Sequence, residues 1–250
     1  MLGKKTFGLL LMGVVLLGVF SAGCITGDSA TTTETVTSST YGVEAAPQGP
    51  PSNVTAGGAM DMYSTDYIAS LPSEDLSVDE IQAILYMREE EKLARDVYLT
   101  LYDQWGIPIF NNIARSEQTH MDMVLALIDK YNLTDPAADK DIGEFENPEL
   151  QALYDQLIEE GMKSEEAALA VGALIEEVDI KDLQDWLDKT DNQDVEYVFE
   201  NLMMGSRNHL RAFTGVLARQ YGVTYEPQVL PQDEYEAIIN SPMENGMTTG

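Results

Sequence analysis

Apolar residues recur three and four positions apart in four long stretches of the chain. This spacing places them on one face of an α-helix, so each stretch predicts an amphipathic helix. The first stretch continues to Gly106 without a proline or a glycine. The predicted helices start at the Ser77-x-x-Glu80 capping box, near Ile109, behind Ser164 and near Asp194.

The connections between these helices differ in length. Two are short joints, whereas residues 132–163 form a long crossover that contains one short helical segment, residues 148–160. One long crossover is typical of ferritin-type bundles, whereas symmetric up-down bundles have short loops throughout. We find no credible strand pattern, GxGxxG, P-loop, CxxC or GxSxG. The expected fold class is therefore all-α, a four-helix bundle with one long crossover.

Titratable residues interrupt the apolar faces of the predicted helices. Both histidines of the chain, His120 and His209, fall on such a face, and Glu117 lies about one turn before His120. Glu91 interrupts the first helix, and Glu176 interrupts the third. Hard oxygen donors and borderline nitrogen donors arranged as in Glu117 and His120 suit iron, manganese or zinc, so this pair predicts a metal site.

The N-terminal segment is typical of an export signal. Two lysines precede an apolar run from Phe7 to Phe20, which is shorter than the roughly 20 residues of a spanning helix. Small residues before the only cysteine, Cys24, resemble the lipobox of prokaryotic lipoproteins, with serine where leucine is usual. We predict a lipoprotein anchored through Cys24 to the outer face of the cytoplasmic membrane or cell envelope. An uncleaved anchor is the alternative.

Composition divides the chain into four parts. Residues 24–73 are rich in Thr, Ser, Gly and Pro with little apolar periodicity, which predicts a flexible tether. The helical domain that follows is long enough for one core. The predicted parts are a signal peptide (1–23), the lipid-anchored tether (24–73), the four-helix domain (74–225) and a C-terminal strap or tail (226–250).

The net charge of the chain is -29. Such acidity argues against nucleic acid and anionic membrane surfaces as partners, since both carry negative charge. It predicts a solvated acidic surface, and bulk charge by itself identifies no metal site. A single cysteine also excludes an internal disulfide.

Several strings of the sequence resemble known helical metalloproteins. In EKLARDVY, Glu91 precedes Ala94 and Tyr98 at the offsets of the first ligand helix in rubrerythrins and bacterioferritins, and SEQTHMDM resembles their second-helix ExxH. ALIEEVDIKDL and NLMMGSRNHLRAF resemble the ferritin-like domain of unknown function 2202, over about residues 77–225. The resemblance implies a ferritin-like fold. In the wider superfamily it implies a carboxylate-bridged pair of irons or manganeses, here held by Glu91, Glu117, His120, Glu176 and His209.

The fourth helix departs from that family pattern. Ser206 stands where ExxH would place a bridging glutamate before His209. Asp179, one turn after Glu176, is a further candidate ligand, and Glu177 is the neighbouring alternative. The centre is therefore a modified dinuclear site, a single-metal site or a relic. Buried carboxylates need hydrogen-bond donors, and the residues expected to contact the ligands in this way are Tyr98, Ser206, Arg207 and Arg211.

The N-terminal segment and the candidate ligands together predict an exported metal-binding protein. If the protein is an enzyme, the resemblance implies a non-haem oxidoreductase acting with oxygen or peroxide. Iron or manganese is expected ahead of zinc or copper. Methionines suit Cu(I), but at helical spacing they predict core filling: Met121, Met123, Met203 and Met204. The alternatives are an interaction bundle with a degenerate site, whose Glu and His form an internal hydrogen-bond network, and a metal-storage module. Glu91 taken alone could also be an exposed residue paired with Arg95. A homodimer is left open, and no electron donor is identified.

Overall fold

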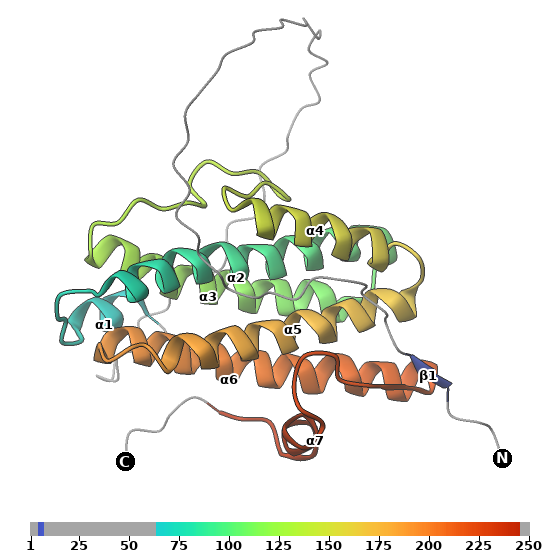
Figure 1. The fold of residues 1–250 in the computed structure, drawn as a ribbon. Helices are drawn as coiled ribbons and strands as arrows, with labels where there is room; N and C mark the ends of the chain where they lie inside the picture. The colour runs from blue at the N-terminus through green and yellow to red at the C-terminus, as the bar shows by residue number, and fades with distance from the viewer. Residues whose placement is uncertain (1–4, 8–63, 246–250) are drawn as a thin grey trace, which may run out of the picture. The chain divides into compact units, whose positions relative to one another are not determined.

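The computed structural model of the chain describes residues 5–7 and 64–245, and this part of the chain is mostly helical (Figure 1). Four long helices dominate it: α2 (Val78–Trp105), α3 (Pro108–Lys130), α5 (Glu165–Leu187) and α6 (Gln193–Val216). α2 packs along α3, and α5 packs along α6. α2 also contacts α5, and α3 contacts α6, so the apolar faces of all four helices meet in one core.

Shorter elements surround the long helices: α1 (Thr65–Ser70), α4 (Pro148–Gly161), the π-helix η1 (Leu217–Tyr221), α7 (Gln232–Asn240) and the strands β1 (Lys5–Phe7) and β2 (Val223–Tyr225). The strands are parallel, with Lys5 paired to Val223. We predicted no strand, because three residues are too few to show an alternating pattern. The rest of the predicted signal peptide and most of the tether, including Cys24, lie outside the described residues. No helix in residues 64–245 is long and apolar enough to cross a membrane.

Local capping chemistry explains where the long helices begin and end. Ser77 and Glu80 form the predicted capping box, in which each side chain accepts the other residue's backbone N–H. α2 ends at Gly106, whose φ of 65° suits glycine, and Pro108 then opens α3. The Ser164 side chain caps α5 by accepting the Ala167 N–H. The predicted starts of the first and third helices are thus confirmed.

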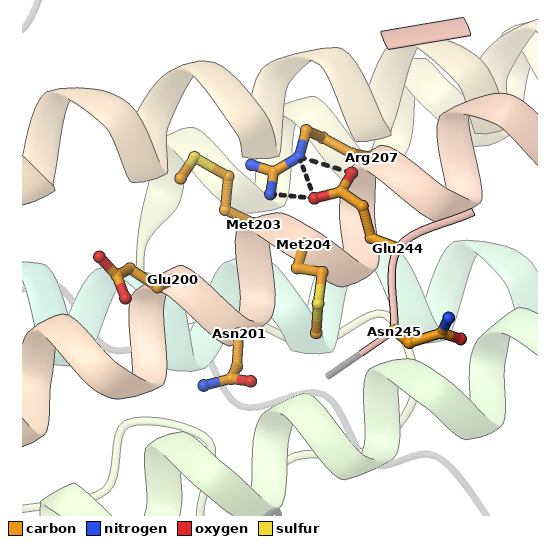
Figure 2. Close-up of a pocket in the computed structure, with 7 residues that line it drawn as sticks. All are labelled: Glu200, Asn201, Met203, Met204, Arg207, Glu244 and Asn245. Atoms are coloured by element: carbon orange, nitrogen blue, oxygen red, sulfur yellow. Dashed lines mark hydrogen bonds and ion pairs between the residues drawn. The ribbon is translucent and has the colours of Figure 1, made fainter. Parts of the chain in front are cut away.

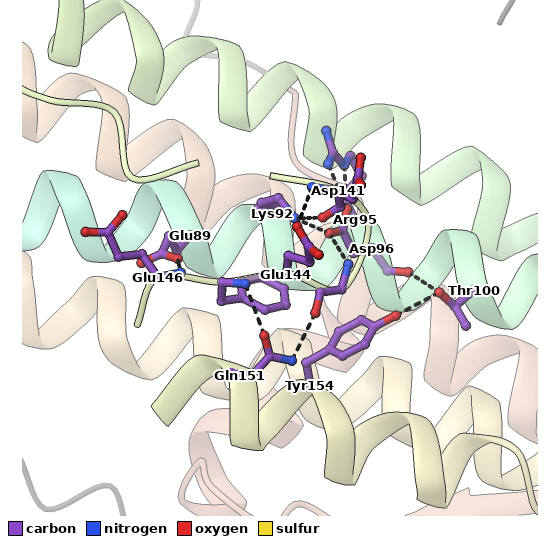
Figure 3. Close-up of polar contacts among 12 residues, drawn as sticks. Glu89, Lys92, Arg95, Asp96, Thr100, Asp141, Glu144, Glu146, Gln151 and Tyr154 are labelled. Atoms are coloured by element: carbon purple, nitrogen blue, oxygen red, sulfur yellow. Dashed lines mark hydrogen bonds and ion pairs between the residues drawn. The ribbon is translucent and has the colours of Figure 1, made fainter. Parts of the chain in front are cut away.

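The crossover between α3 and α5 is tied to α2 by buried charged groups (Figure 3). Lys92 Nζ donates to Asp96 Oδ2 at 2.5 Å and to the Asp141 carbonyl at 2.7 Å. Asp96 Oδ2 also accepts the Gly143 N–H at 3.0 Å. Both charged side chains are almost wholly buried. Asp96 Oδ1 also accepts from the Arg95 guanidinium at 2.7 and 3.0 Å, so this one carboxylate compensates two cations.

Further contacts with α2 hold the crossover near α3, at Asp135, and near α4, at Glu146 and Asn147. Glu89 on α2 accepts the backbone N–H groups of Glu146 and Asn147, the latter at 3.1 and 3.2 Å. Arg88 forms a two-pronged ion pair with Asp135, at 2.9 and 3.0 Å. These contacts position α4 against α2 and α5, on the outside of the long helices.

The C-terminal strap, which we define as residues 226–245, is anchored by Glu177 of α5. This fully buried carboxylate accepts the backbone N–H groups of Gln228, Val229 and Leu230 at 2.9–3.1 Å, and the Tyr225 hydroxyl at 2.5 Å. Glu177 was the alternative candidate ligand, and that alternative is wrong. It lies one position off the core-facing stripe of Glu176, so it points toward the strap instead.

Glu177→Ala should therefore release the strap. The substitution leaves a cluster of buried donors without an acceptor, and we expect it to cost about 3 kcal/mol of unfolding free energy. Melting temperature and limited proteolysis of the C-terminal segment would measure the loss. Glu177→Gln keeps one acceptor oxygen and should lose less. Equal stability of the alanine variant and the parent would contradict the assigned role.

Candidate metal centre

Five titratable side chains that the sequence marked as candidate ligands meet between the four long helices. Glu91 comes from α2, Glu176 from α5 and His209 from α6, while α3 provides both Glu117 and His120. All five are buried. Because Glu117 and His120 are three positions apart, they share one helix face, and the other three side chains meet that face.

Glu91, Glu117 and His120 form the first of two groups that could hold a metal ion, and we call it the His120 position. Nδ1 of His120 lies 3.1 Å from Oε2 of Glu91 and 2.8 Å from Oε2 of Glu117. The ligand atoms of the group all lie within 4.8 Å of one another. Two carboxylates and one imidazole nitrogen thus converge from two helices.

Glu117, Glu176 and His209 form the second group, the His209 position. Nδ1 of His209 lies 2.9 Å from Oε1 of Glu117 and 3.4 Å from Oε2 of Glu176. The rings of His120 and His209 stack with their centroids 5.7 Å apart. Glu117 belongs to both groups, with one carboxylate oxygen toward each imidazole.

Unpartnered polar atoms show that these residues fit a metal ion. Within the described residues, Oε1 of Glu91, Oε1 of Glu117 and Nδ1 of His209 are buried without a hydrogen-bond partner. The last two atoms are close enough for an ion pair but are not aligned as a hydrogen bond. Buried polar atoms without partners are costly, and a cation would satisfy all three. Carboxylate oxygens with imidazole nitrogens are a donor set that iron, manganese and zinc accept.

Two predicted supporting residues contact the centre. The buried Tyr98 hydroxyl donates to Oε1 of Glu176, and the Ser206 hydroxyl donates to Oδ2 of Asp179. Asp179 lies outside both ligand groups, and its Oδ1 has no partner among the described residues. Burial and the nearby Glu91 charge raise the pKa of Asp179 well above its usual value. Asp179 therefore borders the centre without completing either group.

Arg207 and Arg211 were expected to donate to the ligand carboxylates, and the structure corrects this. Arg207 pairs with Glu244 of the strap at 2.5–3.1 Å, beside a surface pocket on α6 (Figure 2). Arg211 donates to Glu244 at 2.6 Å and to the Ile238 carbonyl at 2.8 Å. Because His209 faces inward, the two arginines lie on the outer side of α6, where they fasten the strap.

Sequence reasoning missed two residues at the centre. Ser116 Oγ lies 3.0 Å from Nε2 of His209. Gly205 packs against His120, and a Cβ at this glycine would lie 2.5 Å from Nε2 of that ring. A serine on a helix carries no signal by itself. A glycine inside a helical pattern is a signal, because glycine weakens a helix and therefore suggests that another group packs closely against the backbone there.

The charges of the centre shift the pKa values of its own members. Burial alone would lower the pKa of His209, but the Glu117 and Glu176 carboxylates outweigh it and raise this pKa to about 10. Glu91 and Glu117 likewise raise the pKa of His120 well above its ordinary value, against the effect of burial. Burial raises the pKa of Glu91 to about 7, although the His120 charge opposes it. A metal ion must therefore displace protons from both imidazoles.

The metal-free protein should lose stability as the pH rises from about 5.5 to about 9. A histidine with a raised folded pKa stabilises the fold below its unfolded pKa of about 6.5 and loses that contribution as the pH approaches the folded value, about 10 for His209. Ionisation of Glu91 removes further stability up to its pKa of about 7. We expect a melting temperature in EDTA on the order of 5 °C lower at the higher pH.

The composition supplies a control for this pH profile. His120 and His209 are the only histidines of the chain, so no other imidazole contributes to the profile. A double variant, His120→Gln with His209→Gln, should lose most of the slope between about pH 7 and about pH 9. The same slope in parent and double variant would show that the centre does not cause it.

The fold and the centre define the class of protein: a mostly helical domain with buried Glu and His groups that could hold a metal ion. The chain belongs to the family described as "Uncharacterized protein domain (DUF2202)", whose model matches residues 80–242. The match spans all five candidate ligands and most of the strap. It confirms the family membership that the sequence strings predicted.

A relative in Methanocaldococcus jannaschii, "Uncharacterized protein MJ0754", is 56% identical over 182 residues, which are 73% of this chain and 98% of the relative. The crystal structure of hypothetical protein MJ0754 from Methanococcus jannaschii has a similar fold, with a TM-score of 0.68 at 55% identity. It covers 70% of this chain and 99% of that chain. Neither description states an activity.

Proposed function

We propose that the domain is a ferritin-like four-helix metalloprotein that binds two iron or manganese ions. The observation that carries the proposal is the placement of Glu117, whose two carboxylate oxygens face His120 and His209 separately. A carboxylate placed in this way bridges two ions in di-metal carboxylate bundles. The single long crossover between α3 and α5 supports the same fold.

Each ion would have three protein ligands. Glu91, Glu117 and His120 would hold one ion, and Glu117, Glu176 and His209 would hold the other. A pair of iron or manganese ions supplies redox equivalents for the reduction of oxygen or peroxide, and we propose an oxidoreductase of that kind.

Ser206 distinguishes this centre from a full set of bridging carboxylates. It brings a hydroxyl bonded to Asp179 where a second bridging glutamate would stand. Fewer protein ligands leave space beside the ions for a small oxidant. Tyr98 holds Glu176 by a hydrogen bond from its buried hydroxyl, which fixes that ligand in place.

We also propose that the protein is exported and tethered by lipid on Cys24. The support is the sequence from Lys4 to Cys24. In a prokaryotic host, a Cys24→Ala variant should move from the membrane fraction to the soluble fraction. Retention of the variant in the membrane fraction would contradict lipid anchoring and favour an uncleaved anchor.

Elemental mass spectrometry tests the metal-binding proposal. The full chain would be expressed with iron, manganese, zinc and copper all supplied, beside His209→Ala and the control Asp122→Asn, which removes an exposed carboxylate from the outer face of α3. We expect about one to two equivalents of iron or manganese in the parent and the control, and a loss in His209→Ala. Sub-stoichiometric metal in all three, with melting temperatures unchanged by EDTA, would reject the proposal and favour an interaction bundle.

A further inference from the structure

Neighbouring residues hold the ligands of the His209 position in place. The Tyr98 hydroxyl donates to Oε1 of Glu176, which leaves Oε2 of that carboxylate toward His209. Tyr98 is itself fixed, because it is fully buried and packs against Phe213 with ring centroids 5.2 Å apart. On the other side of the site, Ser116 Oγ lies 3.0 Å from Nε2 of His209. Two of the three ligands are therefore oriented before any ion binds.

The Ser116 contact also selects the nitrogen that binds metal. When Nε2–H of His209 donates to Ser116 Oγ, Nδ1 is the nitrogen that can give up its proton and present a lone pair to the carboxylate side. Ser116 is thus a positioning residue for His209. It lies next to Glu117 in the chain, on a turn of α3 that faces α6.

The His120 position has no comparable support within the described residues. Oε1 of Glu91 has no hydrogen-bond partner. Nε2 of His120 packs against Gly205, which has no side chain that could accept a hydrogen bond. An ion at this position must itself restrict the Glu91 and His120 side chains, and that loss of conformational freedom weakens binding.

We infer that the centre fills in a fixed order, with the first ion at the His209 position and the second, at least about 10-fold weaker, at the His120 position. The inference rests on the proposed two-ion function. Its consequence is a dependence on metal supply. With scarce metal the protein carries one ion, and the bridged pair forms only when free metal exceeds the weaker dissociation constant.

Anaerobic titration of the metal-free full chain with Co²⁺ tests the order, with calorimetry and visible absorption reporting each binding event. The parent should bind two ions, the first at least about 10-fold more tightly. Ser116→Ala should weaken the first event about 10- to 100-fold and leave the second unchanged, and Ser116→Thr, which keeps the hydroxyl, should restore it. Glu91→Gln should remove the second event alone.

Two further results complete the test. Thr119→Ala removes a nearby exposed α3 hydroxyl that bonds only to the Arg115 carbonyl, and it should change neither constant. Two equal constants in the parent, or loss of the tighter event in Glu91→Gln, would overturn the order and leave the two-ion centre standing. A parent protein that binds no Co²⁺ would overturn the proposed function, and the order with it.

Discussion

Glu117→Gln is expected to weaken metal binding at both positions, the largest effect of any single ligand change. Its two carboxylate oxygens lie 2.8 and 2.9 Å from the Nδ1 atoms of His120 and His209, so it is the one ligand that both groups share. Loss of a residue that only supports a ligand weakens metal binding about 10- to 100-fold, so loss of a shared ligand should weaken each site at least about 100-fold.

Comparison with the unshared ligands makes this result interpretable. Glu91→Gln and Glu176→Gln should each remove one ion, whereas Asp122→Asn, an exposed carboxylate on α3, should remove none. Metal counts after dialysis and circular dichroism of each variant would separate lost ligands from lost fold. A Glu117→Gln protein that still holds one ion tightly would show that Glu117 does not bridge.

The helices of this chain could be predicted from sequence because the signals that form them are local. A capping box at Ser77, a left-handed glycine at Gly106 and a serine cap at Ser164 act within a few residues of themselves, and the apolar spacing does the same. The strand pair could not be predicted in this way. Its partners are Lys5–Phe7 and Val223–Tyr225, and no local pattern joins them.

Only the candidate ligands of the centre could be predicted from the sequence. A titratable side chain on an apolar helix face needs a polar partner inside the protein. This argument identifies Glu91 and His209 as candidate ligands from the sequence alone. The residues that hold those ligands depend on which helix faces which. Ser116 was missed because its contact to His209 crosses from α3 to α6, and Arg207 was misplaced because the strap residue Glu244 competes for it.

The crossover shows the same limit on the outside of α2. In sequence, the run from Arg88 to Asp96 looks like a solvated charged face, and such runs usually are. In the structure, Glu89, Lys92 and Asp96 are buried beneath the crossover. They are covered by the crossover, residues 131–164. The spacing of apolar residues along a helix does not predict where such a connection will lie.

Asp96→Ala should be the most destabilising single substitution in this buried network. It would leave the Lys92 ammonium, almost wholly buried, with the Asp141 carbonyl and the Phe145 ring, whose centroid lies 4.6 Å from Nζ. Removing one partner of a buried ion pair costs about 3–5 kcal/mol, because the remaining charge has no compensation. For a domain of this size, the melting temperature should fall by about 10 °C.

A double variant distinguishes two contributions to the unfolding free energy: the cost of an uncompensated Lys92 charge and the net stabilisation by the Lys92–Asp96 ion pair. Lys92→Met with Asp96→Leu removes the buried pair and keeps apolar volume, and such replacements are often neutral or stabilising. Arg95, whose side chain is 18% exposed, loses Asp96 in the single and the double variant alike. We expect the double variant to recover most of the stability that Asp96→Ala loses, as measured by chemical denaturation at fixed pH. A double variant as unstable as the single one would mean that the other Asp96 contacts, to the Gly143 N–H at 3.0 Å and to Arg95 at 2.7 Å, hold the crossover in place. Neutralisation of Lys92 would then be a minor part of the role of Asp96.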